Sequence, residues 1–311
     1  KSVKMEPLKG TVTQGVRVTT EPSMLQTMPE SMVVFGEEEI GERLPEQTEN
    51  VIIKAPEYFM NNREFFSTFV NNLFLPYREE FMDEDNPVTC DTIYGDKTGV
   101  SLMTHQKLVR DYLNNYTPYR GLLLYHGLGS GKTCSSIAIA EGMKSQKKIV
   151  VMTPASLRTN YIEEIKKCGD DLYRKNQFWE FISIAENPEY VDVLSIALSL
   201  SKDFIIRNKG AWLVNVKKPP NYDSLSAVEA KNLESQLDQM ISNKYDFINY
   251  NGLRLGILET LTEGFKKNPF DNTVVIIDEA HNFVSRIVNK LKNEESLSMR
   301  LYRYLLSATN A

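Results

Sequence analysis

The sequence is poor in cysteine, histidine and tryptophan, and it contains no long apolar run. Its three cysteines, Cys90, Cys134 and Cys168, show no paired spacing, and there are only three histidines. This pattern predicts no metal site and is typical of a reducing compartment. No segment is apolar enough over sufficient length to cross a bilayer or to act as a secretory signal, so we expect no membrane partner.

An excess of basic charge is also missing. The chain has 36 Lys and Arg against 41 Asp and Glu, a net charge of −5. This balance argues against a protein that coats nucleic acid through its whole surface, so any polynucleotide contact must be local. The length of 311 residues, with 41% apolar residues, allows one large or two ordinary domains. The first residue is Lys1, which indicates that the chain is a fragment of a longer protein.

One stretch, residues 121–140, organises the rest of the chain. The apolar run Leu122–Tyr125 predicts a buried parallel strand, and Ile137 and Ile139 among small residues predict the start of a buried helix. Between them lies His-Gly-Leu-Gly-Ser-Gly-Lys-Thr, residues 126–133. A strand, a glycine-rich turn and a helix form the context of a phosphate-binding loop.

The residue types of this turn suit ATP with Mg²⁺. Backbone N–H groups and the helix N-terminus attract phosphate oxygens, Lys132 would reach the β- and γ-phosphates, and the Thr133 hydroxyl would ligate the metal. The predicted nucleotide-binding set is Gly127, Gly129, Ser130, Gly131, Lys132, Thr133 and Cys134. His126 occupies the place of the first glycine in the strict motif, but the compact Gly-Leu-Gly-Ser-Gly-Lys-Thr form remains.

A second motif lies far downstream. The β-branched run Thr273–Ile277 predicts a buried strand, and Asp278, Glu279 and His281 follow it directly. Asp278 would hold the magnesium ion, Glu279 would orient and deprotonate the attacking water, and His281 belongs to the same predicted catalytic set. The alternative is an ordinary strand followed by an acidic helix N-cap.

Four further residues are candidate contacts. Gln106 stands about 25 residues before Lys132, and the family resemblance described below implies that it reads the adenine edge. The alternative is a solvent-exposed glutamine on a helix at 104–113. The strand Ile149–Met152 ends at Thr153 and Pro154, with Arg158 following. These three could contact a phosphodiester backbone, or the segment is an ordinary corner with Ser156 as the helix cap.

The remaining segments are read more coarsely. Residues 1–55 predict a polar leader or arm without regular elements, and residues 56–99 an aromatic-rich helix and linker. The aromatic helix would pack on the main domain, with base stacking as the alternative. Residues 171–244 suggest an insertion with strands at 181–182, 204–206 and 212–214 and a helix at 224–242. A last strand is predicted at 302–309.

Taken in order, these motifs resemble the first RecA-like domain of a superfamily 2 helicase of the DEAH/SNF2-like type. The resemblance covers residues 100–311 and implies an α/β fold with an open, mostly parallel sheet, preceded by an irregular or helical N-terminal segment. It also implies that Ser307 and Thr309 couple the nucleotide state to the bound strand. A second RecA-like domain, absent from this chain, would supply an arginine finger, so the chain alone should hydrolyse ATP poorly.

A narrower resemblance rests on residues 121–134, on Phe247–Leu253 and on Val275–Phe283. These stretches are similar to helicases of nucleocytoplasmic large DNA viruses, in particular the small ATPase subunit of the poxvirus early transcription factor. The likeness implies a nucleic-acid partner, DNA in preference to RNA, together with viral RNA polymerase and a second transcription-factor subunit. It places the protein in the virion and in the viral factory of the host cytoplasm.

Two other functions are compatible with the same motifs. One is a SNF2-like translocase that moves on double-stranded DNA during transcription termination or remodelling, without unwinding it. The other is a catalytically silent, virion-packaged structural module, for which His126 and the missing second domain are the only arguments. The intact Lys132–Thr133 and Asp278–Glu279 pairs argue against the silent module.

Overall fold

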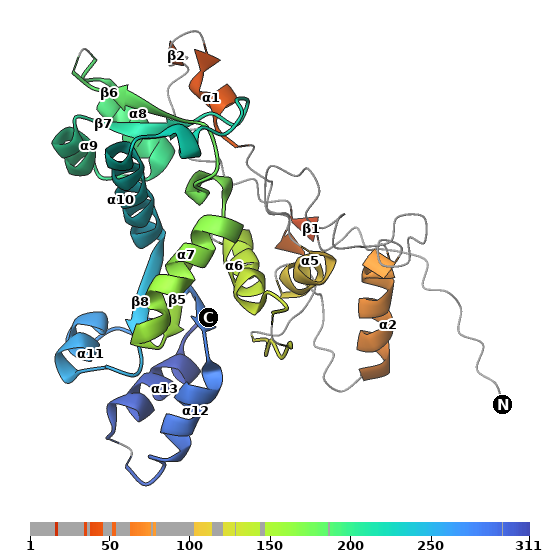
Figure 1. Cartoon of the computed structure of the whole chain (residues 1–311). Helices are drawn as coiled ribbons and strands as arrows, with labels where there is room; N and C mark the ends of the chain where they lie inside the picture. Colours follow the sequence, from red (N-terminus) through yellow and green to blue (C-terminus); the bar gives the residue numbers. More distant parts are fainter. Residues whose placement is uncertain are drawn as a thin grey trace.

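The computed structural model describes residues 16–17, 34–35, 38–45, 52–53, 63–75, 77–78, 103–113, 121–127, 129–143, 147–185, 187–293 and 295–311. A short parallel sheet and the helices around it form the part that carries the predicted motifs (Figure 1). None of the helices in these ranges combines the length and the apolarity that a membrane span requires.

Three parallel strands make up the central sheet. β5 (Lys148–Thr153) lies between β8 (Tyr245–Asn249) and β9 (Thr273–Ile277). Val151 of β5 pairs with Phe247 on one side and with Ile276 on the other. The strands predicted at 149–152 and 273–277 are therefore confirmed. Because the ends of parallel strands meet at one edge, Thr153 and the residues after Ile277 lie close together.

Successive side chains of β5 enter two separate apolar cores. Ile149 and Val151 belong to a core shared with α6 (Lys132–Met143) and α7 (Arg158–Cys168). Val150 and Met152 face the core of α11 (Leu255–Leu261), α12 (Ala280–Val288) and α13 (Leu297–Ser307). Figure 1 shows α11, α12 and α13 grouped together in blue, away from α6. The sheet is thus buried on both faces, as a parallel α/β architecture requires.

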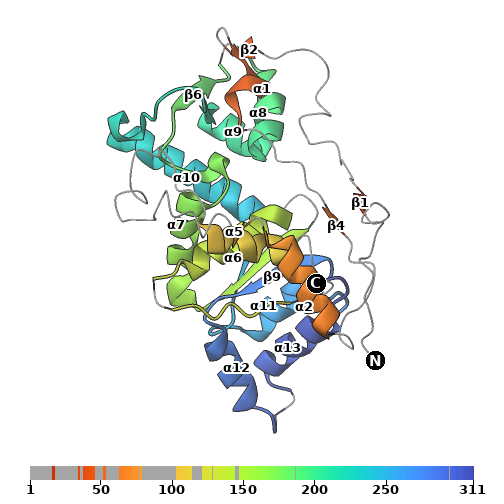
Figure 2. The same ribbon diagram turned by 90° about the vertical axis from the view of Figure 1, so that its right-hand side faces the viewer.

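The predicted insertion is a subdomain of its own strands and helices. β6 (Trp179–Ser183) and β7 (Gly210–Val214) pair antiparallel, and α8 (Tyr190–Leu198) and α9 (Lys202–Asn208) connect them. The single-turn helices η5 (Asp171–Tyr173) and η6 (Tyr222–Ser224) flank this hairpin. The long helix α10 (Ala227–Lys244) then leads back to β8 (Figure 1), and in the turned view it lies between α9 above and α6 below (Figure 2).

Gln236 of α10 completes the edge of β7. Its side chain accepts a hydrogen bond from Trp212 N at 2.7 Å and donates one to Trp212 O at 2.8 Å, and it is 2% exposed. We expect Gln236→Leu to lower the free energy of unfolding by about 2 kcal/mol, because two buried backbone groups lose their partners. Urea unfolding measures this, with Gln239→Leu on the same helix as control, because the hydrogen bond of the half-buried Gln239 to Asn243 is solvent-exposed. Equal stability of the two variants would contradict the assignment.

The N-terminal leader contains a structured segment, contrary to the expectation for residues 1–55. β3 (Glu38–Glu39) pairs with β2 (Val34–Phe35), and α1 (Ile40–Arg43) follows it. Ile40 is buried in the core of the insertion, and the Arg43 guanidinium lies 2.5 Å from a Glu180 carboxylate oxygen. A second short pair joins β1 (Val16–Arg17) to β4 (Ile52–Ile53). Helix α1 is a single turn, which is too short to show a period of apolar residues in the sequence.

The predicted aromatic helix is confirmed as α2 (Arg63–Leu73). Just beyond its end, the Phe74 ring stacks on Tyr112 at 6.4 Å between centroids, next to α5 (Thr104–Asp111). Tyr77 donates a hydrogen bond to Asp111 of the same helix. These contacts support the packing interpretation for this end of the segment. The linker predicted at 83–99 lies outside the described residues.

Three predicted strands are wrong. Residues 121–127 form no regular element, and Tyr125 is 92% exposed, because this segment makes no ladder hydrogen bonds with the sheet. Residues 204–206 belong to α9, where the Ser201 side chain accepts a hydrogen bond from Phe204 N and caps the helix. Residues 302–307 belong to α13, which buries Met299 and Leu301 in the core that it shares with α11 and α12.

Candidate functional site

The predicted phosphate loop closes on itself through the side chain of Lys132. The Lys132 ammonium group donates to the carbonyl oxygens of His126 at 3.2 Å and Gly127 at 2.9 Å. The Ser130 hydroxyl donates to Gly127 O at 2.9 Å. Gly129 and Gly131 have φ angles of 74° and 72°, a conformation that favours glycine. The turn therefore holds a positive charge at the start of α6, although no strand precedes it.

Two side chains of helix α5 contact the backbone of this loop. His105 Nε2 lies 3.0 Å from Ser130 O, and Gln106 Nε2 donates to Gly131 O at 3.3 Å. A Cβ at Gly131 would meet the Gln106 carboxamide, so a side chain there would displace the end of Gln106. Gln106 is only 5% exposed and its Oε1 accepts from Met103 N, which excludes the solvent-exposed alternative. Its predicted contact with adenine stays a prediction.

Asp278 and Glu279 follow β9 and form a sharp turn before α12. Asp278 N donates to Met152 O of β5 at 2.9 Å, and Glu279 has a left-handed φ of 49°. Burial, together with the neighbouring Glu279 carboxylate, raises the pKa of Asp278, whereas the Lys132 ammonium acts in the opposite direction. Helix α6, which begins at Lys132, packs against β9, whose end carries Asp278, so the two motifs lie on neighbouring elements. His281 is exposed, with Nδ1 3.2 Å from Glu279 Oε2.

These groups fit a nucleoside triphosphate with its divalent cation. The donors are the N-terminus of α6, which is a helix of twelve residues, and one lysine ammonium group. Both suit phosphate oxygens. The half-buried Asp278 has a destabilised negative charge, which a magnesium ion would offset. Lys132, Thr133 and Asp278 are the residues that would hold the nucleotide and its metal.

The segment after β5 matches its predicted role only in part. Thr153 is fully buried and its hydroxyl donates to Pro154 O at 3.0 Å, so this hydroxyl does not face solvent. Pro154 is buried as well, and Ser156 does not cap α7, which starts at Arg158. Arg158 is exposed, and its guanidinium lies 5.1 Å from the centroid of the Phe247 ring. Among the three predicted contacts, Arg158 alone presents its side chain to a polynucleotide.

Ser307 and Thr309 lie away from the phosphate loop. Thr309 N donates to Asp271 Oδ1 at 2.7 Å, and Asn272 N donates to Thr309 O at 2.9 Å. Both partners precede β9, at the end opposite Asp278. Ser307 closes helix α13 and accepts a hydrogen bond from Asn268. The prediction that these residues end a strand at the site edge is therefore wrong, because Ser307 belongs to α13 and Thr309 is bonded to the residues that precede β9.

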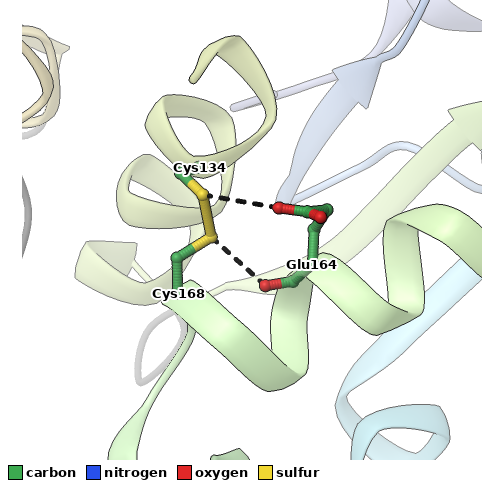
Figure 3. A group of neighbouring side chains, drawn as sticks. All are labelled: Cys134, Glu164 and Cys168. Atoms are coloured by element: carbon green, nitrogen blue, oxygen red, sulfur yellow. Dashed lines mark hydrogen bonds between the residues drawn. A yellow bond between two sulfur atoms is a disulfide. The ribbon is translucent and has the colours of Figure 1, made fainter. Parts of the chain in front are cut away.

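Two of the cysteines are paired, contrary to the prediction from their spacing. Cys134 in the first turn of α6 and Cys168 at the end of α7 form a disulfide across the two helices (Figure 3). Glu164 lies beside them, with ligand atoms of all three residues within 4.8 Å of one another. In reduced form the two thiols and this carboxylate could ligate a metal ion, and the prediction of no metal site stays a prediction.

The site contains one residue that the motifs did not single out. Tyr250, directly after β8, donates through its hydroxyl to the carbonyl oxygens of Asp278 and Glu279. Its sequence signal was an aromatic residue at the end of a buried strand, which core packing alone could explain.

The loop and the carboxylate pair at one sheet edge define a nucleotide-binding domain of the phosphate-loop class. Residues 101–310 match the family described as "Type III restriction enzyme, res subunit", a helicase-family domain. The chain belongs to this family, which implies a RecA-like α/β fold.

Proteins of large DNA viruses are similar to this chain. A protein of Acanthamoeba polyphaga mimivirus, described as "Putative ATP-dependent RNA helicase", is 30% identical over 183 residues, 58% of this chain and 24% of its own length. A "Putative helicase" of Invertebrate iridescent virus 3 is 29% identical over 223 residues, 67% of this chain and 16% of its own length. The chain thus spans about a quarter or less of these relatives. No solved structure matches it.

Proposed function

We propose that this chain is the ATP-binding part of an ATP-dependent nucleic-acid helicase or translocase of a large DNA virus. The observation that carries the proposal is that α6, which begins at Lys132, packs against β9, whose end carries the Asp278–Glu279 turn. One set of groups suits the phosphates, and the other suits a divalent cation and an attacking water. Family membership and the viral helicase relatives support the same function.

The chemistry of this site follows from the charges at its edge. Mg²⁺ bound to the triphosphate would supply charge neutralisation at the β- and γ-phosphates. Lys132 adds a second positive charge there, Thr133 and Asp278 orient the metal side, and Glu279 accepts a proton from the attacking water. A second RecA-like domain of the full-length protein is proposed to contribute an arginine finger, which makes efficient turnover depend on both domains.

The proposed biological setting is early viral transcription. We propose DNA as the track and an initiation factor as the assembly, with viral RNA polymerase and a second factor subunit as partners, in the virion and the viral factory. The support is the origin of the relatives, all from large DNA viruses. Translocation on double-stranded DNA without unwinding is the alternative that the same site permits.

The test uses the full-length protein with Mg²⁺ and ATP. Turnover is measured alone and with single-stranded DNA, double-stranded DNA or single-stranded RNA. We expect DNA to raise kcat, and added salt to weaken that stimulation because phosphate contacts release counterions. Lys132→Ala serves as control for contaminating ATPases and should lose activity by about 10²–10³-fold.

Each outcome of this test supports or rejects one part of the proposal. Stimulation by RNA alone would overturn the DNA track but keep the motor. Stimulation by duplex DNA without displacement of a labelled strand would favour the translocase. ATP binding without turnover in every condition would reject the motor and leave the silent module.

A further inference from the structure

The Tyr250 hydroxyl joins two elements of the site. It donates to Asp278 O at 3.0 Å and to Glu279 O at 3.1 Å, sharing one proton between two consecutive carbonyl groups. Tyr250 is 2% exposed and follows β8, whereas the two carbonyls belong to the turn after β9. Because β5 lies between these strands, the tyrosine spans the width of the sheet at its carboxyl edge.

The turn that it contacts needs external support. Glu279 has a left-handed backbone with φ of 49°, and it stands at the N-cap of α12 without a side-chain capping bond. A non-glycine residue in this conformation is strained and persists only where its surroundings hold it. On one side, Met152 of β5 accepts a hydrogen bond from Asp278 N. On the other side, Tyr250 is the side chain that engages the two carbonyls.

The tyrosine itself is fixed in place. Its ring packs against Phe283 of α12, with 5.4 Å between ring centroids. Both rings belong to the apolar core below the sheet. A buried donor that is fixed by ring packing can hold a strained turn in one geometry.

We propose that Tyr250 is a positioning residue for ATP hydrolysis, which fixes the Asp278–Glu279 turn so that both carboxylates face the metal and the attacking water. The proposal rests on the proposed function, since it assigns these two carboxylates to hydrolysis. Tyr250 touches neither the nucleotide nor the metal, and it acts through backbone carbonyls. The simpler interpretation is an apolar core residue whose hydroxyl has no further effect.

Tyr250→Phe in the full-length protein separates these interpretations, because it keeps the ring and removes only the donor. We expect kcat for ATP to fall about 10-fold, the effect of one lost hydrogen bond on the geometry of a catalytic group. KM for ATP at saturating Mg²⁺ should stay within about two-fold, since the phosphate loop is untouched. The Mg²⁺ concentration for half-maximal nucleotide binding should rise several-fold.

Tyr245→Phe is the matched control. Tyr245 begins the same strand, is 1% exposed and donates its hydroxyl hydrogen bond to Glu141, at the opposite end of β8 from the turn. It should reduce the melting temperature as much as Tyr250→Phe or more, while kcat and the Mg²⁺ requirement stay unchanged. Parallel changes in both variants would overturn the positioning role.

The two proposals fail in different ways. If unmodified protein hydrolyses ATP and Tyr250→Phe has the same kcat and Mg²⁺ requirement, the positioning role is wrong and the motor stands. If unmodified protein binds nucleotide without turnover, the motor is wrong. The Mg²⁺ titration with a fluorescent ATP analogue then still decides whether Tyr250 holds Asp278, because it needs no hydrolysis.

Discussion

Replacing Glu279 with glutamine is expected to lower kcat for ATP hydrolysis by the full-length protein about 10²–10⁴-fold, the range attributed to a positioned general base. Glutamine keeps the size of the side chain but cannot accept the proton of the attacking water. Asp278 and Lys132 remain, so Mg²⁺–ATP binding should persist. The measurement is single-turnover hydrolysis beside equilibrium binding of a fluorescent nucleotide.

The matched control for this variant is Glu263→Gln. Glu263 is an exposed carboxylate whose ion pair with Lys267 spans 2.9 Å, and it lies in the turn after α11. Its substitution should leave kcat unchanged. If Glu279→Gln retained more than about a tenth of the unmodified rate, the assignment of Glu279 as the base would be wrong. Loss of nucleotide binding together with turnover would instead place Glu279 in the binding set.

Continuous β-branched runs were the most reliable guide to the fold. Ile149–Met152 and Thr273–Ile277 become β5 and β9 because both faces of a parallel strand are covered, and such strands favour an unbroken apolar sequence. Their ends then locate Thr153 and Asp278 at one edge. The architecture and the carboxylate pair could thus be predicted from the order of the motifs.

Short apolar runs were ambiguous, because strand and buried helix share them. Residues 204–206 and 302–307 lie within helices, where the apolar residues of neighbouring turns pack beside them. The run at 122–125 lacks a paired strand, and its Leu123 and Tyr125 side chains are exposed. Periodicity over three or four residues cannot distinguish these outcomes. The misplacement of Ser307 and Thr309 follows from the same ambiguity.

Contacts between residues distant in sequence were also beyond prediction. Tyr250 meets the Asp278–Glu279 turn across 28 and 29 positions, and Gln236 reaches Trp212 across 24. Each of these contacts can be predicted only when the ends of the helices and strands are known to within one residue. The pair Cys134 and Cys168 belongs to the same group, since it arises where α6 and α7 lie side by side (Figure 3).

That cysteine pair leads to the second large expected effect. In oxidised protein, Cys168→Ser should lower the free energy of unfolding by about 3–4 kcal/mol, because the disulfide closes a loop whose ends are 34 positions apart and so restricts the unfolded chain. In a reducing buffer, Cys134 and Cys168 of the unmodified protein are two separate thiols. The Cys168 thiol can then donate to Glu164 O at 3.2 Å, and the variant should lose only that weak contact.

Urea unfolding with and without a reductant tests this expectation, with Cys90→Ser as the control that removes a thiol from outside the pair. The oxidised protein should be two hydrogen atoms lighter than the reduced protein. It should show one reactive thiol, whereas reduced Cys168→Ser should show two. A Cys168→Ser penalty that is equal in both buffers would indicate packing rather than a covalent link. Because the bond ties the first turn of the phosphate-loop helix to α7, the oxidised protein should also unfold these two helices together.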